Sequence, residues 1–380
     1  MAKVMAKATA KAKSKTSDPI SELPGWTNAQ TMATPAIPTS MLSPDQIAQM
    51  QHCLEHPLVE VTQSSVKCFM ACPQRYVFRY LMGIASRGVS IPLLVGSAVH
   101  SGLEQLYPVD TSPGPLDPTA VQERMAWAMA AVRQTFEEYM SSPEYASIQD
   151  QLLKGLAQAT AIIESFPRML DQSGWFTTQT EQVVRADPLA TLDSPLVDRM
   201  AGVLDRVVIP NHAEKQWLVE YKTRASLSGY DWTGNLDLDM QVLWYSLLGT
   251  ATGLDMEGFF YVVMGKPAHR LSAKGWEELR DRMMAAIAND PEKYFACIPL
   301  HINYDAVEIM RQNVKMTVAR MDALRAGQVE MHTERCTDYA GCPYKALCAA
   351  GANANRPDEV MNLPQLGLYQ TVRPHSELSQ

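Results

Sequence analysis

Two short apolar segments joined by a polar loop are the strongest constraint on the fold of this chain. Residues 200–208 and 216–222 are rich in Val, Leu, Tyr and Trp, and the loop between them carries turn-forming and polar side chains. This pattern predicts a β-hairpin. If its strands pair symmetrically about the loop, Asp205 lies opposite Glu220, close enough for the two carboxylates to share one ion. Residues two apart on a strand share a face, so Lys222 lies on the side of Glu220.

The same residues allow two other interpretations. A slip of one residue in the strand pairing would move one carboxylate to the other face of the hairpin. An acidic strand that faces solvent, with Lys222 as an ordinary ion-pair partner, has the same local sequence. Under the catalytic interpretation, two carboxylates and a lysine form a divalent-cation site suited to cleaving a phosphodiester.

Further polar groups flank the hairpin on predicted helices. Gly96, His100 and Glu104 recur every four residues and so lie on one helical face. The neutral imidazole of His100 can ligate a metal, although a partly buried histidine with a hydrogen-bond partner is the plainer alternative. Gln241 and Tyr245 are also four apart, and can hold a phosphate or orient a water. Simple packing is the alternative for this pair.

Four cysteines suggest a second metal centre. Cys72 lies in the run Cys-Pro-Gln-Arg-Tyr-Val-Phe, and three more cysteines lie near the end of the chain, namely Cys336, Cys342 and Cys348. Four thiolates can hold a [4Fe–4S] cluster. A structural zinc site is the chief alternative. Ordinary buried thiols are the third interpretation, and the one expected for Cys53, Cys68 and Cys297. We find no secretory signal, so disulfides are not expected.

Six short motifs occur in an order that resembles the RecB-like branch of the PD-(D/E)XK nucleases. This branch includes members with an iron–sulfur cluster, such as the AddB nuclease domain, the CRISPR adaptation nucleases and related phage exonucleases. The resemblance runs from about residue 64 to residue 348. The motifs are Cys-Pro-x-x-Tyr-x-Phe (72–78), Gly-x-x-x-His (96–100), Gly-x-x-Asp-Arg (202–206), Glu-x-Lys (220–222), Gln-x-x-x-Tyr (241–245) and the terminal cysteines. One departure is that five residues separate Cys336 from Cys342, where the family usually has two.

The resemblance implies a set of roles. Mg²⁺ or Mn²⁺ would bind His100, Asp205, Glu220 and the carbonyl of Tyr221. Such ions prefer oxygen ligands, lower the pKa of bound water and neutralise charge on a phosphate. Lys222 would position the attacking water or help to deprotonate it. The implied catalytic set is Asp205, Glu220, Lys222, His100, Gln241 and Tyr245, and the implied iron–sulfur ligands are Cys72, Cys336, Cys342 and Cys348.

Composition limits how such a protein can bind DNA. The chain is 46% hydrophobic and 19% charged, which is typical of a globular protein. Its net charge of −8 argues against a broad basic surface. DNA contacts would therefore form a local, salt-sensitive channel. The candidates are Arg75, Arg79, Arg206 and Arg224, each of which could instead be a solvated surface charge.

The expected fold class is α/β, with a restriction-endonuclease-like core sheet flanked by helices, a large helical insertion and a C-terminal iron–sulfur segment. Residues 1–45, with lysine and alanine and then threonine and proline, predict a disordered basic leader. The nuclease domain is expected over 46–350, with the helical insertion at about 115–170, and a tail over 351–380. Further strands are predicted at 178–185 and 256–264, and helices are predicted to dominate 273–326.

The function expected from these features is that of a stand-alone, Mg²⁺- or Mn²⁺-dependent DNA exonuclease acting on free ends in recombination, repair or phage DNA processing. No ATP-binding phosphate loop is recognisable, so a helicase motor or recombination protein would be a separate partner. A catalytically silent DNA-end-binding or recombination scaffold and a structure-selective endonuclease are the alternatives. No apolar run is long enough to cross a membrane, and a cytoplasmic protein of a prokaryote or phage is expected.

Overall fold

The computed structural model describes most of the chain from Glu60 onward. The described residues are Asp45, Ala48, 60–110, 118–170, 172, 174–186, 199–227, 233–325, 331–337, 341–353, 356–361, 363–372 and 378. The predicted leader, apart from Asp45, and part of the predicted tail therefore lie outside them. No helix among the described residues combines the length and the apolar composition needed to span a membrane.

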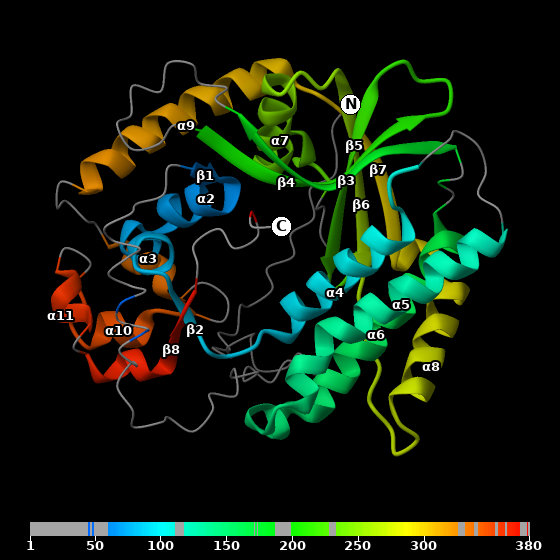
Figure 1. Cartoon of the computed structure of the whole chain (residues 1–380), viewed down its shortest axis with the longest axis horizontal. Coiled ribbons are helices and arrows are strands. Elements are labelled where there is room, and N and C mark those ends of the chain that lie inside the picture. Colours follow the sequence, from blue (N-terminus) through cyan, green and yellow to red (C-terminus); the bar gives the residue numbers. More distant parts are fainter. Residues whose placement is uncertain are drawn as a thin grey trace, which may run out of the picture.

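A mixed β-sheet forms the centre of the molecule (Figure 1). Its order is β1-β4-β5-β6-β7, with β3 paired to the other side of β4. The β1–β4 and β5–β6 pairs are parallel, whereas the β3–β4, β4–β5 and β6–β7 pairs are antiparallel. The strands are β1 (Glu60–Thr62), β3 (Trp175–Ala186), β4 (Arg199–Pro210), β5 (Gln216–Arg224), β6 (Met256–Gly265) and β7 (Phe295–His301).

The predicted hairpin is formed by β4 and β5. Arg206 pairs with Val219, and Val208 pairs with Trp217. This is the symmetric register, and it confirms the predicted pairing. The middle of β5 is buried from Trp217 to Tyr221 because helices cover both faces of the sheet, so this strand is apolar without strict alternation.

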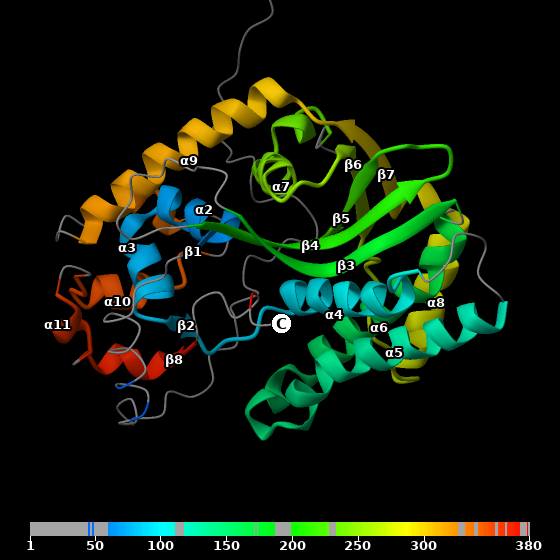
Figure 2. The ribbon, with the colours of Figure 1, turned by 45° about the horizontal axis from the view of Figure 1, so that its top comes forward.

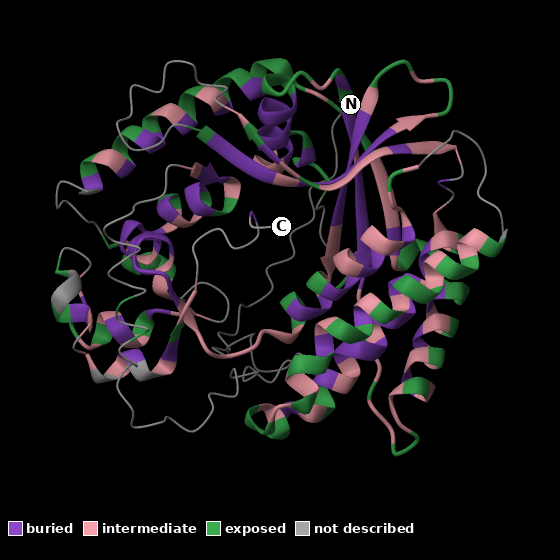
Figure 3. Cartoon of the chain, in the orientation of Figure 1, coloured by how far each residue is buried: buried purple, intermediate pink, exposed green. Residues whose placement is uncertain are grey.

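Helices cover the two faces of the sheet (Figure 2). On one face α4 (Ile91–Leu106), α5 (Pro118–Ser141), α6 (Gln149–Met169) and α8 (Trp276–Asn289) share a core with β5 and β6. On the other face α7 (Met240–Ala251) and α9 (Tyr304–Arg325) share a second core with β4, β5 and β6. Buried residues follow these inward faces (Figure 3). The described part of the segment predicted to be helical at about 115–170 consists of α5, η2 and α6. Through α6 it packs directly on the sheet, where Phe166 meets Tyr221 with ring centroids 6.0 Å apart.

A smaller region joins the two ends of the described chain (Figure 1). Here β2 (Ile84–Ser86) pairs with β8 (Tyr369–Thr371). Tyr344 donates a hydrogen bond from its hydroxyl to the carbonyl of Ile84 at 2.6 Å. The helices of this region are α2 (Gln63–Ala71), α3 (Pro73–Tyr76), the π-helix η1 (Val77–Leu81), α10 (Lys345–Ala349) and α11 (Pro357–Met361). The 3₁₀ turns of the chain are η2 (Pro143–Ile148), η3 (Leu236–Leu238), η4 (Pro291–Lys293), η5 (Thr333–Thr337) and η6 (Pro364–Leu368).

Helices were predicted to dominate 273–326, and α8 and α9 make up most of the described part of this range. The strand β7, which was not predicted, separates the two helices. Pro299 lies within β7 and pairs with Phe260 of β6. Proline argues against a central strand but is tolerated on an edge strand, and β7 ends the sheet order.

Candidate active site

The candidate site lies at a gap in the pairing of β4. On one side, β3 accompanies β4 from Met200 to Pro210. On its other side, β1 pairs with residues 199–201 and β5 with residues 206–208. Residues 202–205 lie between these two ladders. In this gap, Asp205 Oδ2 accepts a hydrogen bond from the backbone N–H of Tyr221 at 2.8 Å. The carboxylate thus pairs with a backbone donor that the β4–β5 ladder leaves unpaired.

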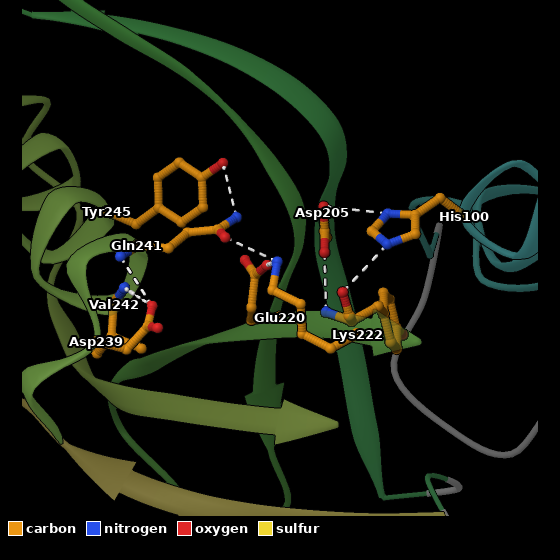
Figure 4. A network of polar contacts seen from close by, with 9 residues as sticks. His100, Asp205, Glu220, Lys222, Asp239, Gln241, Val242 and Tyr245 are labelled. Carbon is orange, nitrogen blue, oxygen red and sulfur yellow. Dashed lines mark hydrogen bonds and ion pairs between the residues drawn. The ribbon is translucent and has the colours of Figure 1, made fainter. Parts of the chain in front are cut away.

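The predicted carboxylates and lysine meet at this gap (Figure 4). Asp205 is 7% exposed and Glu220 is 1% exposed, and extending the observed hairpin register by one residue beyond the Arg206–Val219 pair sets them opposite each other. Lys222 Nζ donates hydrogen bonds to Glu220 Oε1 and, at 2.7 Å, to Gln241 Oε1. The three residues therefore form one contiguous polar cluster on one face of the hairpin.

His100 approaches the cluster from α4. Its Nδ1 lies 3.5 Å from Asp205 Oδ1, and its Nε2 lies 3.1 Å from the carbonyl oxygen of Tyr221. Gly96, one helical turn earlier, allows this approach, because a Cβ there would lie 3.3 Å from Thr223 Oγ1. His100 thus contacts two of the other three ligands expected from the resemblance, Asp205 and the carbonyl of Tyr221.

The other side of the cluster comes from α7. Asp239 caps this helix by accepting the backbone N–H of Gln241 at 2.8 Å. The Gln241 amide then joins Lys222 to Tyr245, whose hydroxyl lies 3.3 Å from Gln241 Nε2. The two α7 residues therefore belong to the polar network around Lys222, as Figure 4 shows.

Glu181 of β3 was missed by the sequence analysis. One ligand atom from each of His100, Glu181 and Asp205 lies within 4.8 Å of the others. The pairs Thr180–Arg206 and Gln182–Leu204 flank the position where Glu181 faces Asp205. Glu181 lies inside the strand predicted at 178–185, but nothing local in the sequence reveals the pairing of that strand with β4.

Burial and crowding of negative charge shift the pKa values of the site. Burial, with the Asp205 charge adding to it, raises the pKa of Glu220 to about 7 and that of Glu181 to about 8. Burial opposes the charged form of His100, but Asp205 more than offsets this and raises the pKa of His100 to about 9. Burial likewise opposes ionisation of Asp205, but His100 and Lys222 together hold its pKa below the usual range.

Lys222 remains positively charged. Burial favours its neutral form, but the Glu220 and Asp205 carboxylates raise its pKa above the ordinary value. At neutral pH its ammonium is therefore a hydrogen-bond donor rather than a base.

The residues of the site fit a hard divalent cation. Among the described residues, Glu220 Oε2 is buried and has no hydrogen-bond partner, although Oε1 of the same carboxylate is paired with Lys222. A buried acceptor without a donor costs about 1–3 kcal/mol. Carboxylate and carbonyl oxygens with one imidazole suit Mg²⁺ or Mn²⁺. A cation here would satisfy the free oxygen and offset the crowded negative charge.

One of the four predicted DNA contacts is wrong. Arg206 is 2% exposed and donates hydrogen bonds to Gln172 Oε1 at 2.6 Å and to Thr177 Oγ1 at 2.7 Å. Its guanidinium also stacks over the Tyr107 ring, 4.3 Å from the centroid. Strand alternation explains the error, because Arg206 follows Asp205 and so points to the opposite face. The other three arginines, which are only half-buried, are Arg75, Arg79 and Arg224.

The four predicted cluster ligands gather in the smaller region. Burial raises the pKa of Cys348, and nearby thiols add to this shift. Those thiols belong to Cys342, Cys72 and Cys336, so all four interact electrostatically. The backbone N–H of Cys342 also donates to the carbonyl of Cys336 at 3.1 Å, so the backbones of these two cysteines lie in contact despite their five-residue spacing.

Cys68 and Cys297, both expected to be ordinary buried thiols, have different surroundings. Burial raises the pKa of Cys68 to about 11, and Cys72 and Cys342 also act on it, so Cys68 lies beside the predicted ligands. Burial raises the pKa of Cys297 to about 11 without any such thiol neighbour. Cys53 lies outside the described residues.

Comparison with known proteins agrees with this geometry. No curated protein matches the chain. The family profile of the PD-(D/E)XK nuclease superfamily matches residues 60–349, which include β1, the hairpin, α4, α7 and the terminal cysteines. With the hairpin carboxylates and lysine gathered at one gap in a mixed sheet flanked by helices, the chain belongs to the PD-(D/E)XK nuclease superfamily.

Proposed function

We propose that this protein is a Mg²⁺- or Mn²⁺-dependent deoxyribonuclease that degrades DNA from a free end. The observation that carries the proposal is the buried, unpaired oxygen of Glu220 among Asp205, His100 and Lys222. A buried oxygen without a hydrogen-bond donor destabilises the protein, and a bound cation would remove this free-energy cost. Membership of the superfamily supports metal-dependent cleavage of nucleic acid.

Each group has a chemical role in this proposal. His100, Asp205, Glu220 and the Tyr221 carbonyl would hold the cation, which when bound would lower the pKa of water and offset negative charge on the phosphate. Lys222, charged and held by Glu220 and Gln241, positions the attacking water and stabilises the charge that develops on the phosphoryl oxygens.

The α7 residues hold Lys222 in place. Gln241 accepts a hydrogen bond from Lys222 and, through its amide nitrogen, contacts the Tyr245 hydroxyl. Burial raises the pKa of Tyr245 well above its usual value, so this hydroxyl stays neutral and keeps its hydrogen-bonding role across the working pH range. Both residues thus support a single geometry of the lysine.

The preference for DNA ends rests on the resemblance to RecB-like and phage exonucleases. Recombination, repair or phage DNA processing is the proposed setting, with a helicase or recombination protein as a separate partner. Arg75, Arg79 and Arg224 are the proposed backbone contacts. Their contribution should weaken as salt rises, because phosphate binding releases counterions.

The first experiment compares wild type with Lys222→Ala on end-labelled linear DNA and circular single-stranded DNA, in Mg²⁺ or Mn²⁺. We expect wild type to degrade only linear DNA. Lys222→Ala should abolish cleavage, yet change metal-free DNA affinity only a few fold, because the lysine acts on the chemical step. Lys215→Ala is the matched control, since Lys215 pairs with Asp255 on the surface. Cleavage retained by Lys222→Ala would refute the assignment.

Two other outcomes would redirect the proposal. Cleavage of the circle would make the enzyme an endonuclease. Binding of DNA ends without any cleavage by metal-loaded wild type would favour a recombination scaffold.

We also propose that Cys72, Cys336, Cys342 and Cys348 hold a [4Fe–4S] cluster. The supporting observation is that four thiols from both ends of the described chain interact within one region, where burial raises the pKa of Cys342 and Cys348. Bound metal would favour their thiolates. A cluster would join the N-terminal helices to the C-terminal segment and so stabilise the fold.

Metal analysis of anaerobically purified protein tests the cluster. Wild type should contain about four irons and be brown. Cys348→Ser should lose the colour and most of the iron, whereas Cys297→Ser, whose thiol lies on β7, should keep both. Stoichiometric zinc in place of iron, or an unchanged absorption spectrum in Cys348→Ser, would overturn the assignment.

A further inference from the structure

Glu181 is a third carboxylate at the candidate site, and the motifs of the sequence do not include it. It reaches the site from β3, on the opposite side of β4 from β5. One of its carboxylate oxygens lies within 4.8 Å of a ligand atom of both His100 and Asp205. Glu181 therefore shares the two groups that α4 and β4 bring to the site.

The backbone of Glu181 is held in an unusual conformation. Its φ is +44°, in the left-handed region, whereas a regular strand residue has negative φ. Non-glycine residues persist there only when the surrounding structure enforces the conformation, and such residues often lie at functional sites. The distortion occurs at the residue that faces Asp205 in the β3–β4 register, which is also the residue whose carboxylate lies near Asp205 and His100.

An independent observation points to a ligand in this place. Glu220 is 1% exposed, and its Oε2 has no hydrogen-bond partner among the described residues. The charge of Glu220 acts on Glu181, so the carboxylate that carries the free oxygen contributes to the electrostatics of the same site. When all three are ionised and His100 is neutral, as a metal ligand must be, Asp205, Glu220 and Glu181 carry three negative charges against one positive charge on Lys222. A single divalent cation balances the remainder.

We propose that Glu181 is an additional ligand of the divalent cation that His100, Asp205 and Glu220 bind. This inference rests on the proposed function and extends it, since it places a ligand on β3 as well as on the hairpin and α4. One cation then connects three strands and a helix. The bond between Glu181 and the cation also compensates for the cost of the unusual backbone conformation at Glu181. No other acidic residue of β3 can make this bond.

Binding of Mn²⁺ to purified protein, measured by calorimetry without DNA, tests the inference. Wild type should bind one Mn²⁺ at the nuclease site. Glu181→Gln removes the charged ligand with little change in shape, and should weaken binding about tenfold or more. The matched control is Glu104→Gln. Glu104 acts electrostatically on Glu181 but is absent from the His100–Glu181–Asp205 group, so its loss should have a much smaller effect.

A second variant separates ligation from folding. Glu181→Gly removes the carboxylate and adopts positive φ without strain, so its melting temperature in EDTA should equal or exceed that of wild type while Mn²⁺ affinity falls as in Glu181→Gln. Equal weakening by Glu104→Gln and Glu181→Gln would show that Glu181 acts only through net charge, and would overturn the inference.

The remaining outcomes distinguish the two proposals. If wild type binds Mn²⁺ and Glu181→Gln binds it equally well, Glu181 is not a ligand but the proposed nuclease stands. If wild type binds no Mn²⁺ at this site, the metal-dependent function itself fails. Two ions in wild type that become one in Glu181→Gln would overturn the single-cation assignment.

Discussion

At the scale of single residues, Tyr221 connects the parts of the site. Its N–H binds Asp205, its carbonyl lies beside His100, and its hydroxyl lies 3.3 Å from Arg206 Nη1. Arg206 in turn binds Thr177, so the guanidinium fixes Tyr221 against β3. A positive charge on the face opposite the carboxylates thus supports the geometry of the site without contacting substrate.

Arg206→Met tests this support. The change leaves buried acceptors on Gln172 and Thr177 without their donor, and should lower the free energy of unfolding by about 2–3 kcal/mol. Arg206→Lys should recover little of the lost free energy of unfolding, because one ammonium cannot replace the planar guanidinium. Urea unfolding monitored by circular dichroism measures both. Arg311→Ala is the control: Arg311 pairs with Glu308 on the surface of α9, and its loss should leave the midpoint unchanged. An Arg206→Met protein as stable as wild type would contradict the role.

At the scale of elements, the site depends on how closely α7 packs against β4. Trp244 Nε1 donates to the carbonyl of Ala201 at 3.1 Å, and Gly202 follows directly. A Cβ at Gly202 would lie 2.7 Å from Tyr245 Cε1. Glycine therefore lets α7 bring Gln241 and Tyr245 to Lys222.

Gly202→Ala should push Tyr245 and α7 away from the strand. We expect a loss of stability of about 1–3 kcal/mol from overpacking, and a lower kcat with little change in DNA affinity. In a Tyr245→Leu background the same substitution should cost clearly less, because the ring atom that it meets is absent. A double-mutant cycle of thermal unfolding and cleavage rates measures the coupling. If the effects of the two substitutions are additive, the strain in Gly202→Ala does not come from contact with Tyr245.

At the scale of the whole molecule, metal-free protein should carry an electrostatic penalty that grows with pH. The folded chain holds protons on Glu220, Glu181 and His100 up to pH values of about 7, 8 and 9, respectively. The unfolded chain releases them near the ordinary pKa values. Between these limits the folded state binds more protons, so its stability falls as pH rises.

The melting temperature in EDTA should therefore fall between pH 6 and pH 9, and Mn²⁺ should remove most of this decline by taking the place of the protons. Glu181→Gln should show a shallower decline in EDTA than wild type. Differential scanning fluorimetry across buffers of equal ionic strength measures it. A metal-free melting temperature that rises over this range would refute the charge arrangement.

Local patterns in the chain predicted the hairpin, the shared side of Asp205, Glu220 and Lys222, and the α/β class, whereas a register slip of one residue stayed open until the strand pairing was seen. These follow from strand alternation and turn chemistry, which act over a few residues. Helical spacing likewise placed Gln241 and Tyr245 together. Three features depend on which distant elements pack on β4 and β5. They are the burial of Arg206, the position of His100 beside Asp205 and the presence of Glu181 at the site. Such contacts arise from sheet order and helix packing across long separations, so only the folded molecule specifies them.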